Sequence, residues 1–174
     1  FLEEIVVPYG TYLVRPRVMV FYYKIACLYF GSGDNDKAID YLNRIINQKD
    51  DLRTDLQCYS RLLHLIAHYE LGNYNLLEYL IKSVYRYMAK MENLSKVEEE
   101  MFRFLRHAFK FNEKTIKPEF EKLLNKLKKY QNNKLEARAF AYLDVISWLE
   151  SKISGINVQD VIRQKYLRER RQNA

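Results

Sequence analysis

The chain has 174 residues, with 5 Gly, 3 Pro and 2 Cys, and a formal net charge of +7 at pH 7. This length suits one domain with a continuous core, and so few turn-forming residues favour helix throughout. The spacing of Cys27 and Cys58 matches neither a metal-binding nor a redox motif, and charged residues interrupt every long apolar run. We therefore expect an all-α cytoplasmic protein that forms a single domain over 1–174, without disulfides or membrane contact.

Two stretches of the chain, 21–45 and 60–84, share a pattern at a spacing of 39 residues. In each, an amphipathic run is followed by a short polar turn that contains Gly33 or Gly72, and then by a second amphipathic run. Apolar residues recur at i, i+3, i+4 and i+7, which places them on one face of a helix. Each stretch is therefore predicted to form an antiparallel helical hairpin, and either Asp34 or Asn35 is the candidate N-cap within the first.

The second half of the chain continues the helical pattern with less similarity. Ser95 and Glu98 have the S-x-x-E spacing of a capping box, so a helix is predicted to begin at about Lys96. A single long helix is predicted in KLEARAFAYLDVISWLESKIS, residues 134–154, and a last helix after it is apolar on only part of its surface. The predicted units are 16–50, 51–92, 95–131 and 134–171, with 1–15 as the remnant of a preceding repeat.

These units resemble the tetratricopeptide repeat (TPR), a helix–turn–helix motif. The resemblance rests on Tyr22, Ile25, Ala26, Tyr29, Gly33 and Ala38 in the first unit, and on Leu65, Tyr69, Gly72, Asn73 and Tyr74 in the second. The third unit keeps only the apolar phase, and the period exceeds that of the motif. The resemblance implies a right-handed α-α superhelix of about four hairpins, and we interpret the chain as a divergent, C-terminal part of a bacterial TPR-containing protein.

In TPR proteins the first helix of each hairpin lines a concave groove. The resemblance assigns to this groove the partner-binding candidates Tyr23, Phe30, Tyr59, Tyr69, Phe102 and Phe109, with Arg103, Arg106 and Lys110 toward one end. Aromatic and arginine side chains dominate binding energy at protein interfaces. The expected ligand is a peptide or helix with an apolar face and an acidic end. The alternative occupant is the protein's own preceding repeats.

Catalysis and metal binding have little support in the sequence. His64 and His68 have the i, i+4 spacing that can chelate a metal, but no third ligand stands at a helpful spacing, so structural roles are predicted for both. No His lies at motif spacing from a candidate nucleophile. We therefore expect a non-enzymatic interaction scaffold with no cofactor and no metal.

The positive charge is concentrated in two regions. Residues 103–134 hold ten Lys or Arg against three acidic residues, and 163–171 hold five against one. A nucleic-acid-binding repeat that uses these regions is the alternative function, and a purely structural section of a larger solenoid is a third. Lys122, Lys126 and Lys129 form a stripe on a return helix, which we interpret as a solvated face.

Overall fold

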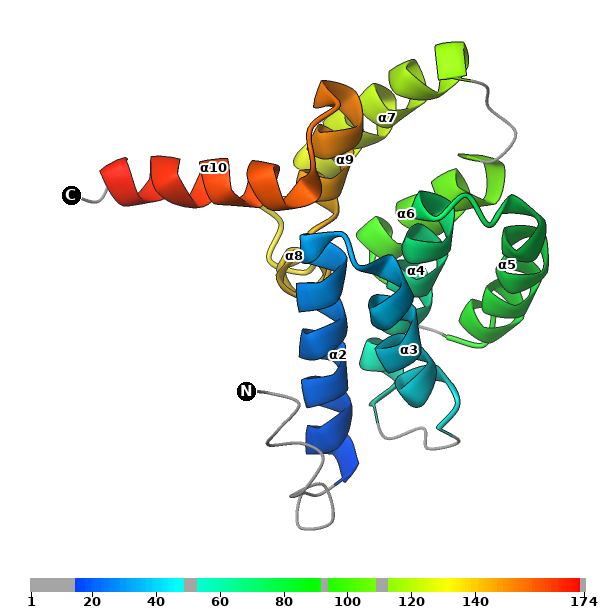
Figure 1. Ribbon diagram of the computed structural model, residues 1–174. Coiled ribbons are helices and arrows are strands. Elements are labelled where there is room, and N and C mark those ends of the chain that lie inside the picture. Colours follow the sequence, from blue (N-terminus) through cyan, green and yellow to red (C-terminus); the bar gives the residue numbers. More distant parts are fainter. Residues whose placement is uncertain (1–14, 49–52, 92–93, 109–112, 173–174) are drawn as a thin grey trace. The chain divides into compact units, whose positions relative to one another are not determined.

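The computed structural model describes residues 15–48, 53–91, 94–108 and 113–172, and these ranges contain helices and no strand (Figure 1). The described residues group into two compact units. The first holds the helices before residue 92, and the second holds the later helices together with Gly31–Gly33. The boundary near residue 92 falls between the predicted units 51–92 and 95–131.

The described residues of the first unit form four helices, which run alternately up and down in Figure 1. They are α2 (Arg15–Ser32), α3 (Asn35–Ile46), α4 (Thr54–Glu70) and α5 (Tyr74–Met88). The helix α3 packs against α4, and α4 packs against α5. Gly33 and Gly72 adopt positive φ angles of 87° and 69° in the turns between paired helices, a conformation that glycine reaches without a steric penalty. The helices and turns predicted for the first two hairpins are confirmed.

Local sequence explains how the first hairpin begins and closes. Asp34 caps α3, because its carboxylate accepts a hydrogen bond from the backbone N–H of Lys37 at 3.2 Å, as predicted. The ring of Tyr41 on α3 lies 5.9 Å from the rings of both Tyr22 and Tyr29 on α2. Ala38 is fully buried.

The centre of the first unit is α4, which is buried on most of its surface. Its polar side chains bind the neighbouring helices. Gln57 donates a hydrogen bond from Nε2 to the carbonyl of Ile45 on α3 at 2.7 Å, and the guanidinium of Arg61 lies 3.7 Å from the ring centroid of Tyr87 on α5. These contacts join α4 to both α3 and α5.

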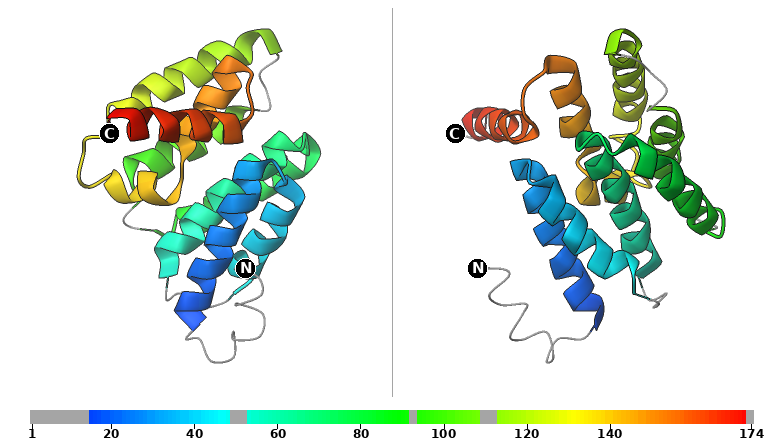
Figure 2. Two further views of the ribbon diagram at one scale, coloured as in Figure 1. Left: turned by 60° about the vertical axis from the view of Figure 1, so that its left-hand side comes forward. Right: turned by 45° about the vertical axis from the view of Figure 1, so that its right-hand side comes forward.

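Five helices are described in the second unit. They are α6 (Lys96–Ala108), α7 (Glu113–Lys128), α8 (Ala137–Tyr142), α9 (Val145–Ser154) and α10 (Val158–Gln172). The helix α7 packs against α6 and α9, α8 contacts α6, and α10 follows α9 and packs against it, as the views of Figure 2 show. Gly155 ends α9 with a φ of 74°.

The prediction of one continuous helix over 134–154 is wrong. Leu143 is extended, with φ −124° and ψ 100°, and separates α8 from α9. Asp144 then caps α9 by accepting a hydrogen bond from the backbone N–H of Ser147 at 3.1 Å. A short acidic side chain that bonds its own backbone competes with helix continuation, which explains the break. Leu135 is 85% exposed and lies before α8.

Candidate functional site

The aromatic candidates of the first unit do not all face solvent. Tyr23 on α2 and Tyr59 on α4 are buried, with 2% and 4% of their surface exposed. Phe30 and Tyr69 are partly exposed, and the ring of Tyr69 packs edge-on against that of Tyr74 at 5.9 Å. Only Phe30 and Tyr69 therefore present surface to a partner.

The other candidates belong to α6 and the segment that follows it. Phe102 is partly exposed, and Arg103 and Arg106 are exposed. Phe109 and Lys110 lie outside the described residues. The predicted groove residues are thus divided between the two compact units, and the structure brings only one of them, Arg103, into a described cleft.

This cleft lies between α6 and α7 in the second unit and has a volume of about 270 Å³. Its walls combine apolar and charged side chains: Glu100, Arg103, Phe104, His107, Glu119, Lys122, Leu123 and Lys126. Three of these side chains carry a positive charge and two carry a negative charge, with His107 counted as neutral. We call it the α6/α7 cleft.

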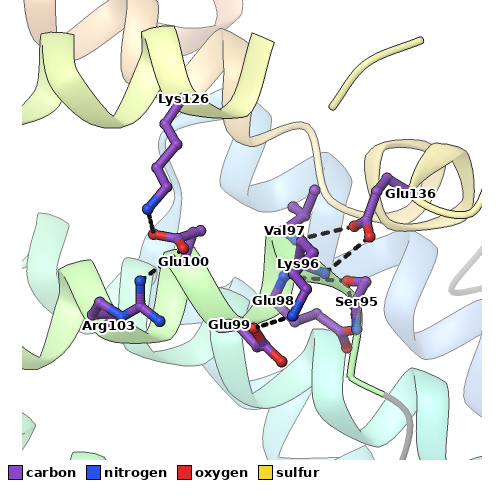
Figure 3. A network of polar contacts seen from close by, with 9 residues as sticks. All are labelled: Ser95, Lys96, Val97, Glu98, Glu99, Glu100, Arg103, Lys126 and Glu136. Carbon is purple, nitrogen blue, oxygen red and sulfur yellow. Dashed lines mark hydrogen bonds and ion pairs between the residues drawn. The ribbon is translucent and has the colours of Figure 1, made fainter. Parts of the chain in front are cut away.

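Glu100 holds the basic side chains of the cleft in place. Its side chain is only 10% exposed, yet it carries two ion pairs, from Oε1 to Nη1 of Arg103 and from Oε2 to Nζ of Lys126, both at 2.8 Å (Figure 3). The pair with Lys126 connects α6 to α7. Lys122 pairs with Glu119 one turn earlier on its own helix, where its side chain is 72% exposed. A buried carboxylate needs such partners, because desolvation disfavours its charge.

The apolar wall of the cleft continues into the core of the second unit. The ring of Phe104 lies 5.1 Å from that of Phe120 on α7 and 6.4 Å from that of Trp148 on α9. Phe120 and Trp148 meet edge to face at 5.6 Å, and both are buried. Phe104 on α6 therefore packs against rings from two other helices, α7 and α9.

Two glutamates fix the first turn of α6. Ser95 and Glu98 form the predicted capping box: the Glu98 carboxylate accepts from the backbone N–H of Ser95 at 2.8 Å, and the Ser95 hydroxyl accepts from the backbone N–H of Glu98 at 3.2 Å. The carboxylate of Glu136 accepts hydrogen bonds from the backbone N–H groups of Lys96 and Val97 at 3.0 and 3.1 Å (Figure 3). A negative charge there is favoured by the helix dipole.

Sequence reasoning missed most of this site. The stripe of Lys122 and Lys126 was visible in the spacing but was interpreted as a solvated face, whereas both residues line the cleft. Glu136 gave no local signal, because its partners lie on α6. Glu100 pairs with Arg103 on its own helix, but its second partner, Lys126, lies on α7. The partners of Glu136 are about forty positions away in the chain.

The histidine pair of α4 is buried and apart from the cleft. The rings of His64 and His68 lie 4.5 Å apart, and Nε2 of His64 has no hydrogen-bond partner among the described residues. Burial, with smaller contributions from His68 and Arg61, lowers the pKa of His64 to about 4. Within the described ranges, no group of three or more His, Cys, Asp or Glu side chains is placed to hold a metal ion.

Comparison of the chain with protein-family models, with curated proteins and with solved structures found no match. Among the described helices, none is both long and apolar enough to span a membrane. The functional argument therefore rests on the residues of this chain.

Proposed function

We propose that this protein is a non-enzymatic interaction module of the cytoplasm, which binds a peptide or helix of a partner protein. The proposed architecture is a TPR-like, right-handed stack of hairpins. The turns at Gly33 and Gly72, which join consecutive helices, and the buried Ala38 support this architecture. Cys27 and Cys58 are not joined by a disulfide, which supports a reducing compartment.

The observation that carries the proposal is the α6/α7 cleft. Phe104 and Leu123 offer an apolar wall, while Arg103, Lys122 and Lys126 supply positive charge beside it. A ligand side chain that is apolar, followed by one or two acidic residues, satisfies both kinds of surface. Glu100 and Glu119 offset two of the three cations, so the cleft favours a ligand with few negative charges over a polyanion.

The proposal is tested with fluorescent peptides in which a Leu or Phe precedes two Glu residues, by anisotropy at low salt. The informative variant is Lys122→Glu, because Lys122 is exposed and its loss leaves both partners of Glu100 in place. We expect peptide affinity to fall roughly 5- to 30-fold, the effect of about 1–2 kcal/mol. Lys117→Glu is the matched control, since Lys117 is an exposed residue of the same helix that does not line the cleft.

A charge-swapped peptide, with Lys in place of Glu, separates direct contact from local unfolding. It should bind Lys122→Glu better than the unchanged protein. If Lys122→Glu and Lys117→Glu weaken peptide binding equally, the proposal that the peptide binds in the α6/α7 cleft is wrong. If instead Tyr69→Ala or Arg106→Ala weakens binding and Lys122→Glu does not, the surface of the first helices is the site. Absence of peptide binding would favour a structural section of a larger solenoid.

A further inference from the structure

The C-terminal helix α10 is attached to the second unit by one side only. Val161 is buried. Lys165 donates a hydrogen bond from Nζ to Oγ of Ser147 at 2.9 Å and forms an ion pair with Glu150 at 2.8 Å, and both of these partners lie on α9. Beyond these contacts every described residue from Tyr166 to Gln172 is exposed. Figure 1 shows this part of α10 extending away from α7 and α9.

The exposed part of α10 combines arginines with apolar side chains. Tyr166 is 60% exposed, Leu167 41% and Ile162 39%. Four arginines are exposed around them, and none has an ion pair among the residues that the structure describes: Arg163, Arg168, Arg170 and Arg171. In contrast, Arg103, Lys122 and Lys126 of the other basic region pair with glutamates.

The spacing of these residues decides between kinds of partner. Arg163, Tyr166 and Arg170 stand at i, i+3 and i+7, so one stripe alternates arginine, aromatic ring and arginine. Ile162 and Leu167 are five residues apart and flank this stripe on different sides, since each residue turns by about 100°. The helix therefore lacks the continuous apolar stripe that a helix groove or a membrane surface requires.

We propose that α10 binds single-stranded nucleic acid, with Arg163 and Arg170 on phosphates and Tyr166 stacked on an unpaired base. Guanidinium groups bind phosphate oxygens in a bidentate geometry, and an exposed aromatic ring offers a stacking surface to any base. This site is separate from the α6/α7 cleft and independent of the peptide-binding proposal. Of the two basic regions found in the sequence, the proposal assigns nucleic-acid binding to α10 alone.

The proposal is tested by fluorescence anisotropy with a single-stranded oligonucleotide of about 16 nucleotides, a length within the usual site sizes. If each of the four exposed arginines of α10 neutralises about one phosphate, the plot of log K against log salt should have a slope of about −3. Affinity should then fall about 50-fold between 50 and 200 mM salt. The matched duplex should bind more weakly, because its bases are not free to stack.

Two variants have different expected signatures. Arg163→Gln with Arg170→Gln should reduce the slope to about −1.5. Tyr166→Ala should lower affinity at least about fivefold and leave the slope unchanged. The α7 double variant, Lys117→Gln on α7 with Lys129→Gln directly after its end, makes the same change in net charge and should alter neither quantity. Peptide binding at the α6/α7 cleft should be unaffected by the α10 variants, so the two proposals fail separately.

Three results would overturn the proposal. The first is no binding at 50 mM salt. The second is equal loss in the α10 and α7 double variants, which would indicate attraction by net charge alone. The third is binding of poly-glutamate as tight as that of the oligonucleotide, with no effect of Tyr166→Ala, which would identify an acidic protein as the partner.

Discussion

Glu136 caps a helix that begins forty residues earlier in the chain: its Oε1 accepts a hydrogen bond from the backbone N–H of Lys96 at 3.0 Å. The other carboxylate oxygen accepts from Val97, and Glu136 is 5% exposed. The first N–H groups of a helix have no partner within it, so a buried helix start needs an acceptor from elsewhere. Glu136 supplies that acceptor and joins the segment before α8 to the wall of the cleft.

Replacing Glu136 by Ala should therefore destabilise the second unit by about 1–3 kcal/mol, because two donors at the start of α6 lose their charged acceptor. Glu136→Gln should have a smaller effect, since the amide oxygen still accepts. Urea unfolding monitored by the fluorescence of Trp148, the single tryptophan of the chain, measures the change. Glu121→Ala, which removes an exposed carboxylate from α7, should leave the transition unchanged.

The helices were predictable where local chemistry decides the structure. Asp34 and the Ser95–Glu98 box bond to backbone within three residues, and Gly33 and Gly72 adopt the positive φ that their turns require. These features depend on neighbours in the sequence, so the sequence contains their whole explanation. The break at Leu143 was missed because the apolar spacing continues through it, and only the capping bond of Asp144 interrupts the helix.

The candidate site was less predictable than the helices, for a physical reason. Arg103 was selected from its charge, but its place in a cleft depends on Glu100 and on Lys126 of another helix. Tyr23 and Tyr59 have the spacing of groove residues, yet they are buried. Periodicity distinguishes the faces of one helix, whereas burial depends on which helices pack against each face.

The ion pairs of Glu100 should respond unequally to the removal of their members. Arg103→Ala with Lys126→Ala leaves a buried carboxylate without its cations, and we expect a loss of about 2–4 kcal/mol in stability. Glu100→Gln leaves two cations that are 61% and 45% exposed and can be hydrated, so its cost should stay below about 1 kcal/mol. Unfolding monitored by Trp148 compares the two. Equal costs would show that Glu100 is not effectively buried.

The stability of the first unit should decrease in mild acid because of His64. In the unfolded chain His64 gains a proton near pH 6.5, whereas in the folded protein burial lowers its pKa to about 4. Its stabilising contribution is therefore complete above pH 6.5 and is lost as the pH falls toward 4. At pH 4.5 we expect a loss of roughly 2 kcal/mol relative to pH 7. Hydrogen exchange of the α4 amides measures this change.

The control for this pH effect is His64→Leu, which keeps an apolar side chain of similar size and cannot be protonated. Burial also lowers the pKa of His68, while Asp36 opposes this shift, so His68 adds to the effect in the same direction. The variant should lose most of the difference between pH 7 and pH 4.5. An unchanged difference would mean that other groups cause it and that His64 is accessible to water.

The break between α8 and α9 gives a prediction whose sign is informative. Asp144→Ala removes the carboxylate that accepts from the backbone N–H of Ser147 at 3.1 Å. If this cap fixes the start of α9, the substitution should destabilise the second unit by about 1 kcal/mol. If the apolar spacing instead favours one continuous helix over 134–154, the higher helix propensity of Ala should make the substitution neutral or stabilising.

If the cap fixes the start of α9, Asp144→Asn should be nearly neutral, because Asn is also a good N-cap. Urea unfolding monitored by Trp148, four residues after the cap, measures each variant, and Glu121→Ala again controls for the loss of one negative charge.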